Sequence, residues 1–463
     1  MPVRLSPAQL ASRSVAVIGA GPTGLGAAHR LAELGHAGFT VFEQAPRAGG
    51  LAASFQDEAG FTWDVGGHVQ FSHYRYFDAA VDTAMRGEWC LHDREAWIWM
   101  RDRFVPYPLQ NNIHLLPDAE KKACIIGLLR RRAEASTPRD FATWVRARFG
   151  DGLADTFLLP YNAKVWAHPP TDLGHYWIGE RVAQVDLEQV ILRLIDNTPD
   201  VSWGPNRQFK FPATGGTGEI WRRLADRLPA GSVRYGARVS SIDVAARRLS
   251  FDDGTSATYD VLVTTLPLDT LCGLTGLTPS QPLKYSTVHV LGFGLAGAPP
   301  AHLQRKCWIY YPEDVCPFYR LTVFSNYSPA NVPDISRHWS VMVEVSESPR
   351  KPVNRHTLVD DVRDGLLRTG VITPQTDVVS VWQHTADHGY PTPFIDRDLV
   401  VDPLLKALEQ YGIYSRGRFG AWKYEVSNQD HSFMQGVELI DRLASGAEEL
   451  TLWRPDVVNA GVR

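Results

Sequence analysis

Short apolar runs broken by glycine open the chain and predict a strand, a helix and a second strand. Residues 14–19 form a β-branched run that ends in glycine, which is typical of a buried parallel strand. Residues 23–34 carry a helical pattern closed by Gly35, and residues 39–43 form the next strand pattern. Together these elements predict a βαβ unit, from which parallel sheets are built.

Farther along the chain the pattern changes twice. Residues 78–194 are mostly helical in pattern, with amphipathic helices expected at 121–134 and 141–149. Strands are expected at 233–242, 248–251 and 261–265. Alternation of apolar and polar residues over 286–347 predicts an antiparallel sheet, with strands that include 288–293, 320–324 and 339–345. Further helices are expected near 359–367 and 433–445.

Length and charge narrow the classes of protein. A chain of 463 residues predicts two or three domains. A formal net charge of −4 gives no general attraction for nucleic acid or an anionic membrane, so neither is an expected partner. The five cysteines are widely spaced and contain no C-x-x-C pair, which argues against a disulfide framework and a zinc site. With no apolar run of about 18 residues, we expect a cytoplasmic protein.

A glycine motif follows the first strand. Gly19, Gly21 and Gly24 match G-x-G-x-x-G, in which glycines permit a tight turn and close approach of a pyrophosphate to the helix N-terminus. Glu43 ends the next strand at the spacing expected of an acid that accepts from a ribose hydroxyl. A solvent-exposed acid at a strand end is the simpler explanation of Glu43 alone. The motif lies between a strand and a helix, which favours a dinucleotide site.

A second glycine pair separates the two common dinucleotides. Gly49, Gly50 and Leu51 follow the second strand and resemble the FAD signature of glutathione-reductase-like flavoproteins, although an ordinary turn would also explain them. FAD is therefore favoured over NAD. We expect an α/β fold with a Rossmann-like FAD-binding domain in three pieces (1–85, 201–280 and 386–463), a helical domain (86–200) and an antiparallel sheet domain (281–385).

Longer segments narrow the family. Residues 64–77, which include Gly66, Gly67, His68 and Phe71, resemble the histidine loop of UDP-galactopyranose mutases of the eukaryotic type. Without that resemblance, a lone histidine is more simply a core residue, although a Gly-Gly-His loop also permits close approach to a planar ligand. Segments at 105–112, 159–166, 179–182, 306–329, 387–393 and 417–434 are similar to the same family.

The resemblance implies roles for individual residues. Arg181 and Arg320 would clamp a diphosphate, because forked, permanently charged donors suit it. Exposed salt bridging would explain either arginine alone. Four tyrosines would assist in binding the diphosphate: Tyr310, Tyr327, Tyr390 and Tyr424. Without the resemblance, packing in a core would explain them. Residues expected around the uridine are Tyr107, Gln110, Phe157, Asn162 and Trp166. Residues expected near the sugar or flavin are Phe71, Asn206, Trp308 and Arg418. Further flavin contacts are expected from His68, Asn428, Gln429 and Ser432. Capping would also explain Gln110 and Asn206.

The implied activity is a ring isomerisation without net redox change. FAD, reduced by NADPH, would interconvert UDP-galactopyranose and UDP-galactofuranose, a step in galactofuranose biosynthesis, through a covalent adduct between flavin N5 and the sugar. His68, Arg181, Arg320 and Arg418 would support catalysis, and residues 179–187 and 202–208 match flaps that close over substrate. Departures from the family pattern at Trp99, Leu109, Ala163 and Thr214 leave the base and sugar open.

Three alternatives stay open. An amine-oxidase-like or desaturase-like oxidoreductase could use the same fold, because fold does not fix function. A non-catalytic binding protein would bind FAD or UDP without isomerising a sugar. A related mutase would act on another nucleotide hexopyranose. The diphosphate clamp argues for a nucleotide-sugar substrate, and the sequence leaves the formation of a homo-oligomer open.

Overall fold

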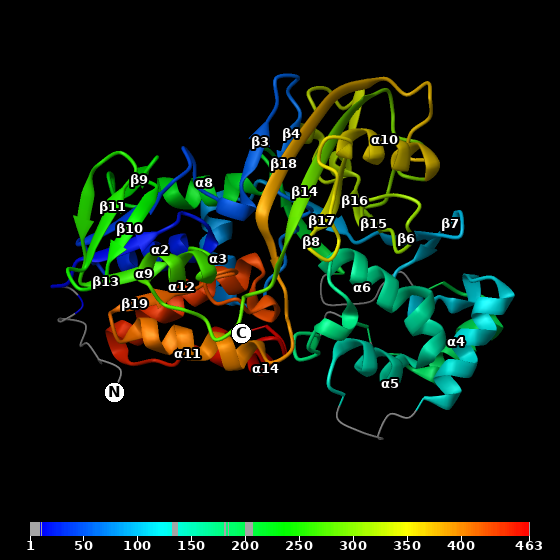
Figure 1. The fold of residues 1–463 in the computed structure, drawn as a ribbon. Helices are drawn as coiled ribbons and strands as arrows, with labels where there is room; N and C mark the ends of the chain where they lie inside the picture. The colour runs from blue at the N-terminus through cyan, green and yellow to red at the C-terminus, as the bar shows by residue number, and fades with distance from the viewer. Residues whose placement is uncertain are drawn as a thin grey trace.

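The computed structural model describes residues 10, 12–131, 138–179, 182–183, 185–199 and 207–462. In Figure 1 a region built on a parallel sheet lies on the left, helices occupy the lower right, and an antiparallel sheet stands above them. Among the described residues, no helix combines the length and the apolar character needed to cross a lipid bilayer. The expected α/β fold class is confirmed.

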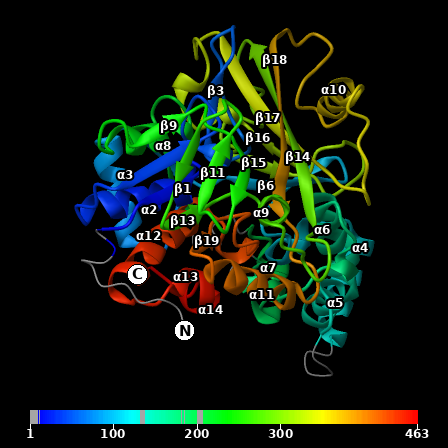
Figure 2. The same cartoon turned by 60° about the vertical axis from the view of Figure 1, so that its left-hand side comes forward.

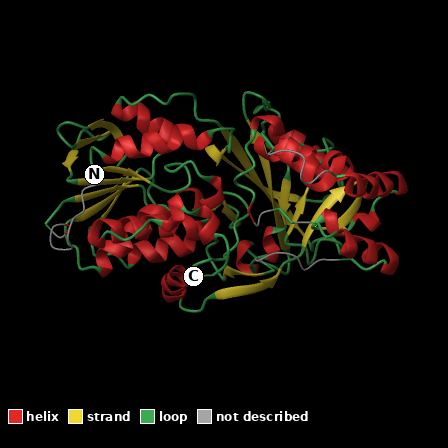
Figure 3. Ribbon diagram, turned by 90° about the horizontal axis from the view of Figure 1, so that it is seen from below, coloured by secondary structure: helices red, strands yellow, loops and turns green. Residues whose placement is uncertain are grey.

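The parallel sheet is the predicted nucleotide-binding core. Its five strands have the order β19-β13-β1-β2-β9, and every pairing is parallel. Helix α2 joins β1 to β2, which confirms the βαβ unit predicted at the front of the chain. Helices lie on both sides of these strands (Figure 3), so near-continuous apolar strands are buried on both faces. The strands are β1 (Val15–Ile18), β2 (Phe39–Glu43), β9 (Val233–Tyr235), β13 (Val261–Thr264) and β19 (Ile413–Ser415).

Small residues bring the two central helices into contact. Helix α2 (Pro22–Glu33) packs along α12 (Gln429–Ser445), which begins four residues before the predicted start at residue 433. A methyl group on Gly26 would lie 2.2 Å from the Phe433 carbonyl oxygen, and one on Gly436 would lie 2.1 Å from the Thr23 carbonyl oxygen. The C-terminal helix is thereby fixed beside the glycine motif. Helices α3 (Arg75–Met85) and α8 (Gly218–Asp226) also contact each other and α12 or α2.

The second sheet has seven strands in the order β18-β14-β17-β16-β15-β6-β7. All pairings are antiparallel except β15 with β6, so the antiparallel sheet predicted over 286–347 is confirmed and extended. Strands β14 and β18 lie side by side along most of their length (Figures 1 and 2). The strands are β6 (Ala96–Met100), β7 (Arg103–Pro106), β14 (Tyr285–Ala296), β15 (Trp308–Tyr310), β16 (Arg320–Thr322), β17 (His338–Glu347) and β18 (Val378–Pro391).

Two secondary-structure predictions are wrong. The mostly helical pattern predicted for residues 78–194 overlooked three strands, β5 (Trp89–Asp93), β6 and β7. Strands β5 and β6 pair with strands far away in the sequence, and β7 pairs with β6. Residues 233–242 are not one strand. Gly236, at φ +70°, separates β9 from β10 (Val239–Asp243), and the two strands belong to different sheets. Strand β18 also runs across the expected domain boundary between residues 385 and 386.

The remaining elements agree more closely with the predicted positions. Helix α10 (Leu358–Arg368) covers the range expected at 359–367, and α5 (Phe141–Leu153) covers that expected at 141–149. Helix α4 (Asp118–Arg130) contains most of the range predicted at 121–134, part of which lies outside the described residues. The other helices are α6 (Leu159–Trp166), α7 (Leu187–Asp196), α9 (Leu268–Thr275), α11 (Arg397–Glu409), α13 (Leu450–Trp453) and α14 (Pro455–Val458). The other strands are β3 (Ser54–Gln56), β4 (Thr62–Asp64), β8 (Gln208–Pro212), β11 (Arg248–Phe251) and β12 (Ser256–Thr258).

Candidate functional site

Two glycine segments lie against each other at the N-terminus of α2. The Gly49 N–H donates to the Ala20 carbonyl oxygen at 2.9 Å, and Gly21 caps α2 without a side-chain hydrogen bond. A methyl group on Gly24 would lie 1.8 Å from the Gly19 carbonyl oxygen, so the third glycine of the motif is required by packing. This glycine-lined backbone, with free amides at a helix N-terminus, fits the pyrophosphate of FAD.

Glu43 is buried rather than solvent-exposed. It is 6% exposed, and its carboxylate accepts from the Ala20 N–H at 2.7 Å and from the Ala45 N–H at 2.8 Å. Burial raises the pKa of Glu43, and the two backbone hydrogen bonds oppose that rise. The acid therefore fixes the glycine turn, and its remaining lone pairs could accept from a ribose hydroxyl.

The predicted flavin residues near the C-terminus gather at the start of α12. Asn428 precedes the first turn, Gln429 accepts from the Trp221 indole at 2.9 Å, and the buried Ser432 lies one turn later. Leu51 packs half-buried against the core on the other side of the parallel sheet. The three polar residues lie on one helix end, whereas Leu51 stands beside the second glycine segment.

The Gly-Gly-His loop rests against the antiparallel sheet. Gly66 has φ +105°, and a methyl group on Gly67 would lie 2.7 Å from the Thr322 hydroxyl and 3.6 Å from the Arg320 guanidinium carbon. The pKa of His68 is lowered to about 4, first by burial and also by the charges of Arg320 and Arg418, while the charge of Glu344 opposes the shift. His68 is therefore neutral near pH 7 and lies within electrostatic reach of Arg320 and Arg418.

Glu344 joins this loop to Arg320. Its carboxylate accepts from Arg320 Nε and Nη2 at 2.8 Å each, from the Gly67 N–H at 2.9 Å and from the Tyr319 hydroxyl at 2.6 Å. Although burial alone would raise it, the pKa of Glu344 is lowered, first by the charge of Arg320 and then by these hydrogen bonds. Glu344 was not among the predicted site residues. The available signal was an acid between two valines in a strand that is mostly buried.

Arg418 occupies a second cationic position in the same part of the molecule. It donates to the Gly389 carbonyl oxygen at 3.0 Å and to the Ser427 hydroxyl at 2.9 Å. Its guanidinium carbon lies 4.8 Å from the centre of the Tyr390 ring and 5.9 Å from that of Tyr424. These contacts fix the guanidinium at the meeting point of β18 and the segment before α12.

Aromatic rings predicted for substrate binding form two sets of ring contacts that pack in the same hydrophobic core. Ring centres are 5.0 Å apart for Tyr107 and Tyr310, 5.8 Å for Trp166 and Tyr390, and 4.7 Å for Trp166 and Tyr424. Phe157 joins through Tyr161, which stacks on it at 5.3 Å and lies 5.1 Å from Tyr310. Tyr161 was not among the predicted site residues, although it lies in a segment that resembles the family. We call this set the aromatic group: Tyr107, Phe157, Tyr161, Trp166, Tyr310, Tyr390 and Tyr424.

Other predicted residues contact residues outside this group. Trp308 and Tyr327 pack on Phe209, with ring centres 6.0 and 5.5 Å apart, and Phe71 packs on His73 at 4.9 Å. Gln110 donates to the Ala183 carbonyl oxygen at 2.8 Å, and Asn162 donates to the Leu158 carbonyl oxygen at 2.8 Å, one turn back in the helical segment.

Arg181 and Asn206 lie outside the described residues, as do parts of both predicted flaps. The pairing of Arg181 with Arg320 therefore stays a prediction.

The departures from the family pattern lie in different environments. Leu109 is fully buried in the helical core, and Trp99 stacks on Tyr311 with ring centres 6.0 Å apart. Thr214 is exposed, and Ala163 lines a cavity that none of the predicted site residues lines. Trp99 and Ala163 therefore stand away from the aromatic group, whereas Leu109 packs in the same core as Tyr107 and Phe157.

A buried trio of His73, Asp430 and His431 fastens the end of the histidine loop to α12. Asp430 accepts from the His73 backbone N–H at 3.0 Å and lies 2.8 Å from His73 Nδ1. The three side chains could in principle hold a metal ion, since one ligand atom from each lies within 4.8 Å of the others. The direct hydrogen bonds between His73 and Asp430 account for the arrangement without an ion.

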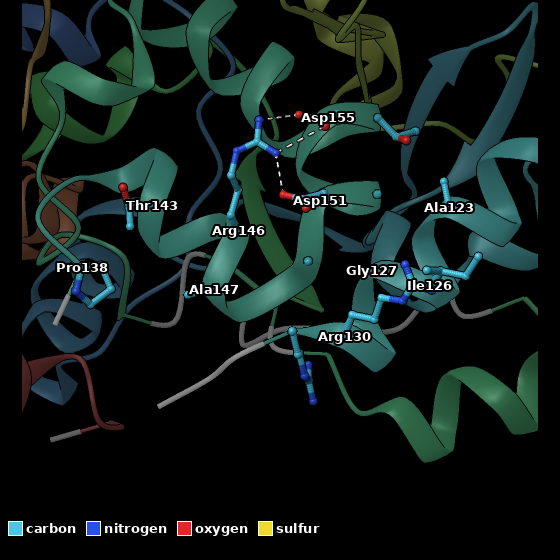
Figure 4. Close-up of a pocket in the computed structure, with 14 residues that line it drawn as sticks. Ala123, Ile126, Gly127, Arg130, Pro138, Thr143, Arg146, Ala147, Asp151 and Asp155 are labelled. Carbon is cyan, nitrogen blue, oxygen red and sulfur yellow. Dashed lines mark hydrogen bonds and ion pairs between the residues drawn. The ribbon is translucent and has the colours of Figure 1, made fainter. Parts of the chain in front are cut away.

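A pocket of about 660 Å³ lies elsewhere, between α4 and α5 (Figure 4). Arg146 lines it and pairs with Asp151 at 2.8 Å and Asp155 at 2.6 Å. None of the residues predicted to bind cofactor or substrate lines this pocket. The concentration of predicted residues, rather than the size of a pocket, therefore identifies the candidate site.

Comparisons with known proteins agree with this geometry. Residues 22–314 match the family model described as flavin containing amine oxidoreductase. The chain is similar to a reduced UDP-galactopyranose mutase of known crystal structure, with 47% identity, 98% of each chain covered and a TM-score of 0.94. A putative protoporphyrinogen oxidase from Exiguobacterium sp. 255-15 is 17% identical (93% of this chain and 98% of that chain, TM-score 0.71). A fatty acid isomerase from P. acnes is 13% identical (93% and 99%, TM-score 0.63). The last two share the fold.

Proposed function

Because the chain belongs to the UDP-galactopyranose mutase family of flavin-containing enzymes, we propose that it interconverts UDP-galactopyranose and UDP-galactofuranose with reduced FAD. The observation that carries this proposal is 47% identity over nearly the full length of both chains. The position of Arg320, beside the Gly-Gly-His loop and the aromatic group, supports it, because a leaving diphosphate needs a forked cation there.

When bound, the reduced flavin supplies the nucleophile for the anomeric carbon of the sugar. The chain's own residues position the reactants and stabilise charge. Arg320, held at a fixed orientation by Glu344, would bind the diphosphate before and after it leaves the sugar. Tyr310 and Tyr390 lie within electrostatic reach of Arg320, and burial keeps both protonated by raising the pKa of each hydroxyl. Both can therefore donate hydrogen bonds.

His68 would act as a neutral group beside the cofactor. Its lowered pKa excludes a protonated imidazole near pH 7, so its loop would contribute backbone groups and shape rather than a positive charge. The Gly67 N–H is already bound to Glu344, and the Gly66 carbonyl accepts from the His68 N–H at 3.0 Å. The carbonyl groups of Gly67 and His68 would therefore be the ones that contact a ligand. Arg418, in the segment before α12, would add a second cation.

Anaerobic turnover tests the proposal. FAD-loaded protein, reduced with dithionite and given UDP-galactofuranose, should form UDP-galactopyranose without consuming a redox acceptor. The oxidised protein should be inactive. An amine-oxidase-like activity would instead require oxygen or another acceptor, and a binding protein would leave the substrate unchanged. Turnover with another nucleotide hexopyranose, but not with the galactose sugar, would favour a related mutase. NADPH as the reductant and a cytoplasmic location are part of the proposal.

A further inference from the structure

A second cavity, of about 500 Å³, lies on the side of α6 that faces away from the aromatic group. Pro160, Ala163 and Lys164 line it from one face of the helix, whereas Asn162 and Trp166 project from the other. The turn after β17 contributes Lys351. We call this space the lysine cavity, after Lys164 and Lys351.

Both lysines are held in place by neutral oxygens. The Lys164 ammonium, 5% exposed, donates to the Glu313 carbonyl oxygen at 2.6 Å, with Cys316 Sγ at 3.8 Å. The Lys351 ammonium donates to the Ser346 carbonyl oxygen at 2.6 Å and its hydroxyl at 3.3 Å. Within the described ranges, no carboxylate lies within 4 Å of either ammonium. Each ammonium has three N–H groups, so a ligand could accept from both.

The two charges repel each other. The pKa of Lys351 is lowered to about 8, first by burial and then by the charge of Lys164, against smaller opposing contributions from Asp314 and Glu347. Burial also lowers the pKa of Lys164. Two partly desolvated ammonium groups in one cavity are unfavourable unless an anion joins them, because each lacks a charged partner.

The acids near the cavity are mostly bound to other groups. Glu313 lies in contact with Arg101, and Asp155 pairs with Arg146 at 2.6 Å. Glu347 accepts from Arg355 at 2.8 Å and lies 2.7 Å from His289.

Besides Arg101, two further basic residues line the cavity. His168 lies 3.2 Å from the Tyr285 carbonyl oxygen, and burial lowers the pKa of His168, so it is neutral. Arg350, two-thirds exposed, lies 3.8 Å from Asp172. Among the described residues that line the cavity, Asp314 is the one acid without an ion pair of its own. It faces three positive charges, those of Lys164, Lys351 and Arg350.

We propose that the lysine cavity binds a phosphate group, which accepts hydrogen bonds from Lys164 and Lys351 while Arg350 contributes charge at the rim. The ligand is inorganic phosphate or a small phosphate monoester. This site is separate from the one under Proposed function, since α6 lies between them. An occupied cavity would fix α6, and with it Trp166 and Tyr161, against the antiparallel sheet.

Calorimetric titration of the FAD-loaded protein with inorganic phosphate, and separately with glucose 1-phosphate, tests this site. We expect millimolar binding near neutral pH and a loss of affinity as Lys351 loses its proton above about pH 8. Lys351→Met should weaken the affinity about tenfold, which is typical of losing one charge-assisted hydrogen bond. Lys406→Met removes the same charge from an exposed lysine on α11, and should leave the affinity unchanged.

Binding of both ligands would support a site that accepts free phosphate and phosphate monoesters. Binding of glucose 1-phosphate alone would support a site for phosphate monoesters. Absence of binding by either ligand, or equal affinity in the protein and Lys351→Met, would overturn the proposal. Crystals of the FAD-loaded protein soaked in tungstate give an independent measurement. Anomalous density between Lys164 and Lys351 is expected, and density confined to the Arg320 region would contradict it.

Discussion

The glycine turn at the front of the chain and the Arg320–Glu344 pair are two halves of one candidate site, built in different ways. The turn joins Gly19, Gly24 and Glu43 within one βαβ unit. The pair joins β16 to β17, and Glu344 reaches Gly67, which is 277 residues away in sequence. The first half is encoded locally, whereas the second exists only after the sheet has formed. Substitutions in the glycine turn should therefore abolish flavin binding, whereas substitutions in the Arg320–Glu344 pair should reduce activity with flavin retained.

The largest effect is expected from Gly24→Val. Its first added carbon alone would lie 1.8 Å from the Gly19 carbonyl oxygen, so the strand and helix must separate where FAD is expected to bind. The purified variant should lack flavin absorbance and activity. Gly273→Ala, on a helix with nothing within 4 Å of the new carbon, is the matched control and should retain both. Full flavin retention in Gly24→Val would show that the turn does not hold the cofactor.

Arg320→Ala should retain flavin but lose activity by about a thousandfold or more, since a positioned cation is removed from the developing charge. It should also destabilise the fold by about 3 kcal/mol, because Glu344 is left buried without a partner. Steady-state kinetics and denaturant unfolding measure the two effects. Arg355→Ala removes an exposed partner of Glu347 and should change neither by much. Near-normal kcat in Arg320→Ala would remove the clamp from the mechanism.

A smaller effect is expected from Glu344→Gln. The amide can still accept from Gly67 or Arg320 but no longer compensates the guanidinium charge. We expect a ten- to hundredfold loss in kcat/KM with flavin retained, together with a changed flavin spectrum because the Gly-Gly-His loop shifts. Glu347→Gln is the matched control in the same strand. An unchanged spectrum with reduced activity would confine Glu344 to orienting Arg320.

The smallest effect near neutral pH is expected at His68, whose contribution to stability changes only as the pH falls. Its pKa is lowered to about 4 in the folded protein, against about 6.5 when unfolded. Between these values the unfolded chain binds more protons, so the stability from a neutral His68 is complete above pH 6.5 and falls as pH decreases toward 4. Denaturant unfolding should show a smaller loss between these pH values in His68→Asn than in the parent, by about 3 kcal/mol. Equal losses would mean that His68 is not held neutral.

The contrast between local and long-range contacts also decides what could be predicted from sequence. The βαβ unit, the glycine motif and α10 depend on contacts within short stretches, and periodicity places them correctly. Strands β5 and β6 were missed because they pair with residues more than a hundred positions away, and pairing outweighs local propensity. Strand β7 forms only as the partner of β6. Glu344 was missed for a related reason. An acid in a strand does not indicate a site until the fold shows that Arg320 and Gly67 contact it.

Resemblance supplied what periodicity could not. It brought Tyr107, Tyr310, Tyr390 and Tyr424 into one set, and the structure places their rings together with Trp166 in the aromatic group. Physical pattern alone would have assigned each ring to a core. The lysine cavity was indicated by neither method, because Lys164 and Lys351 become neighbours only through the packing of α6 on the sheet.

The position of UDP in the FAD-loaded protein, determined by crystallography, tests the central claim most directly. We expect diphosphate oxygens within about 3 Å of the Arg320 guanidinium, beside the Gly-Gly-His loop, with the uracil ring among Tyr107 and Phe157. A diphosphate bound away from Arg320, for example at the lysine cavity, with Arg320 still paired only to Glu344, would contradict it.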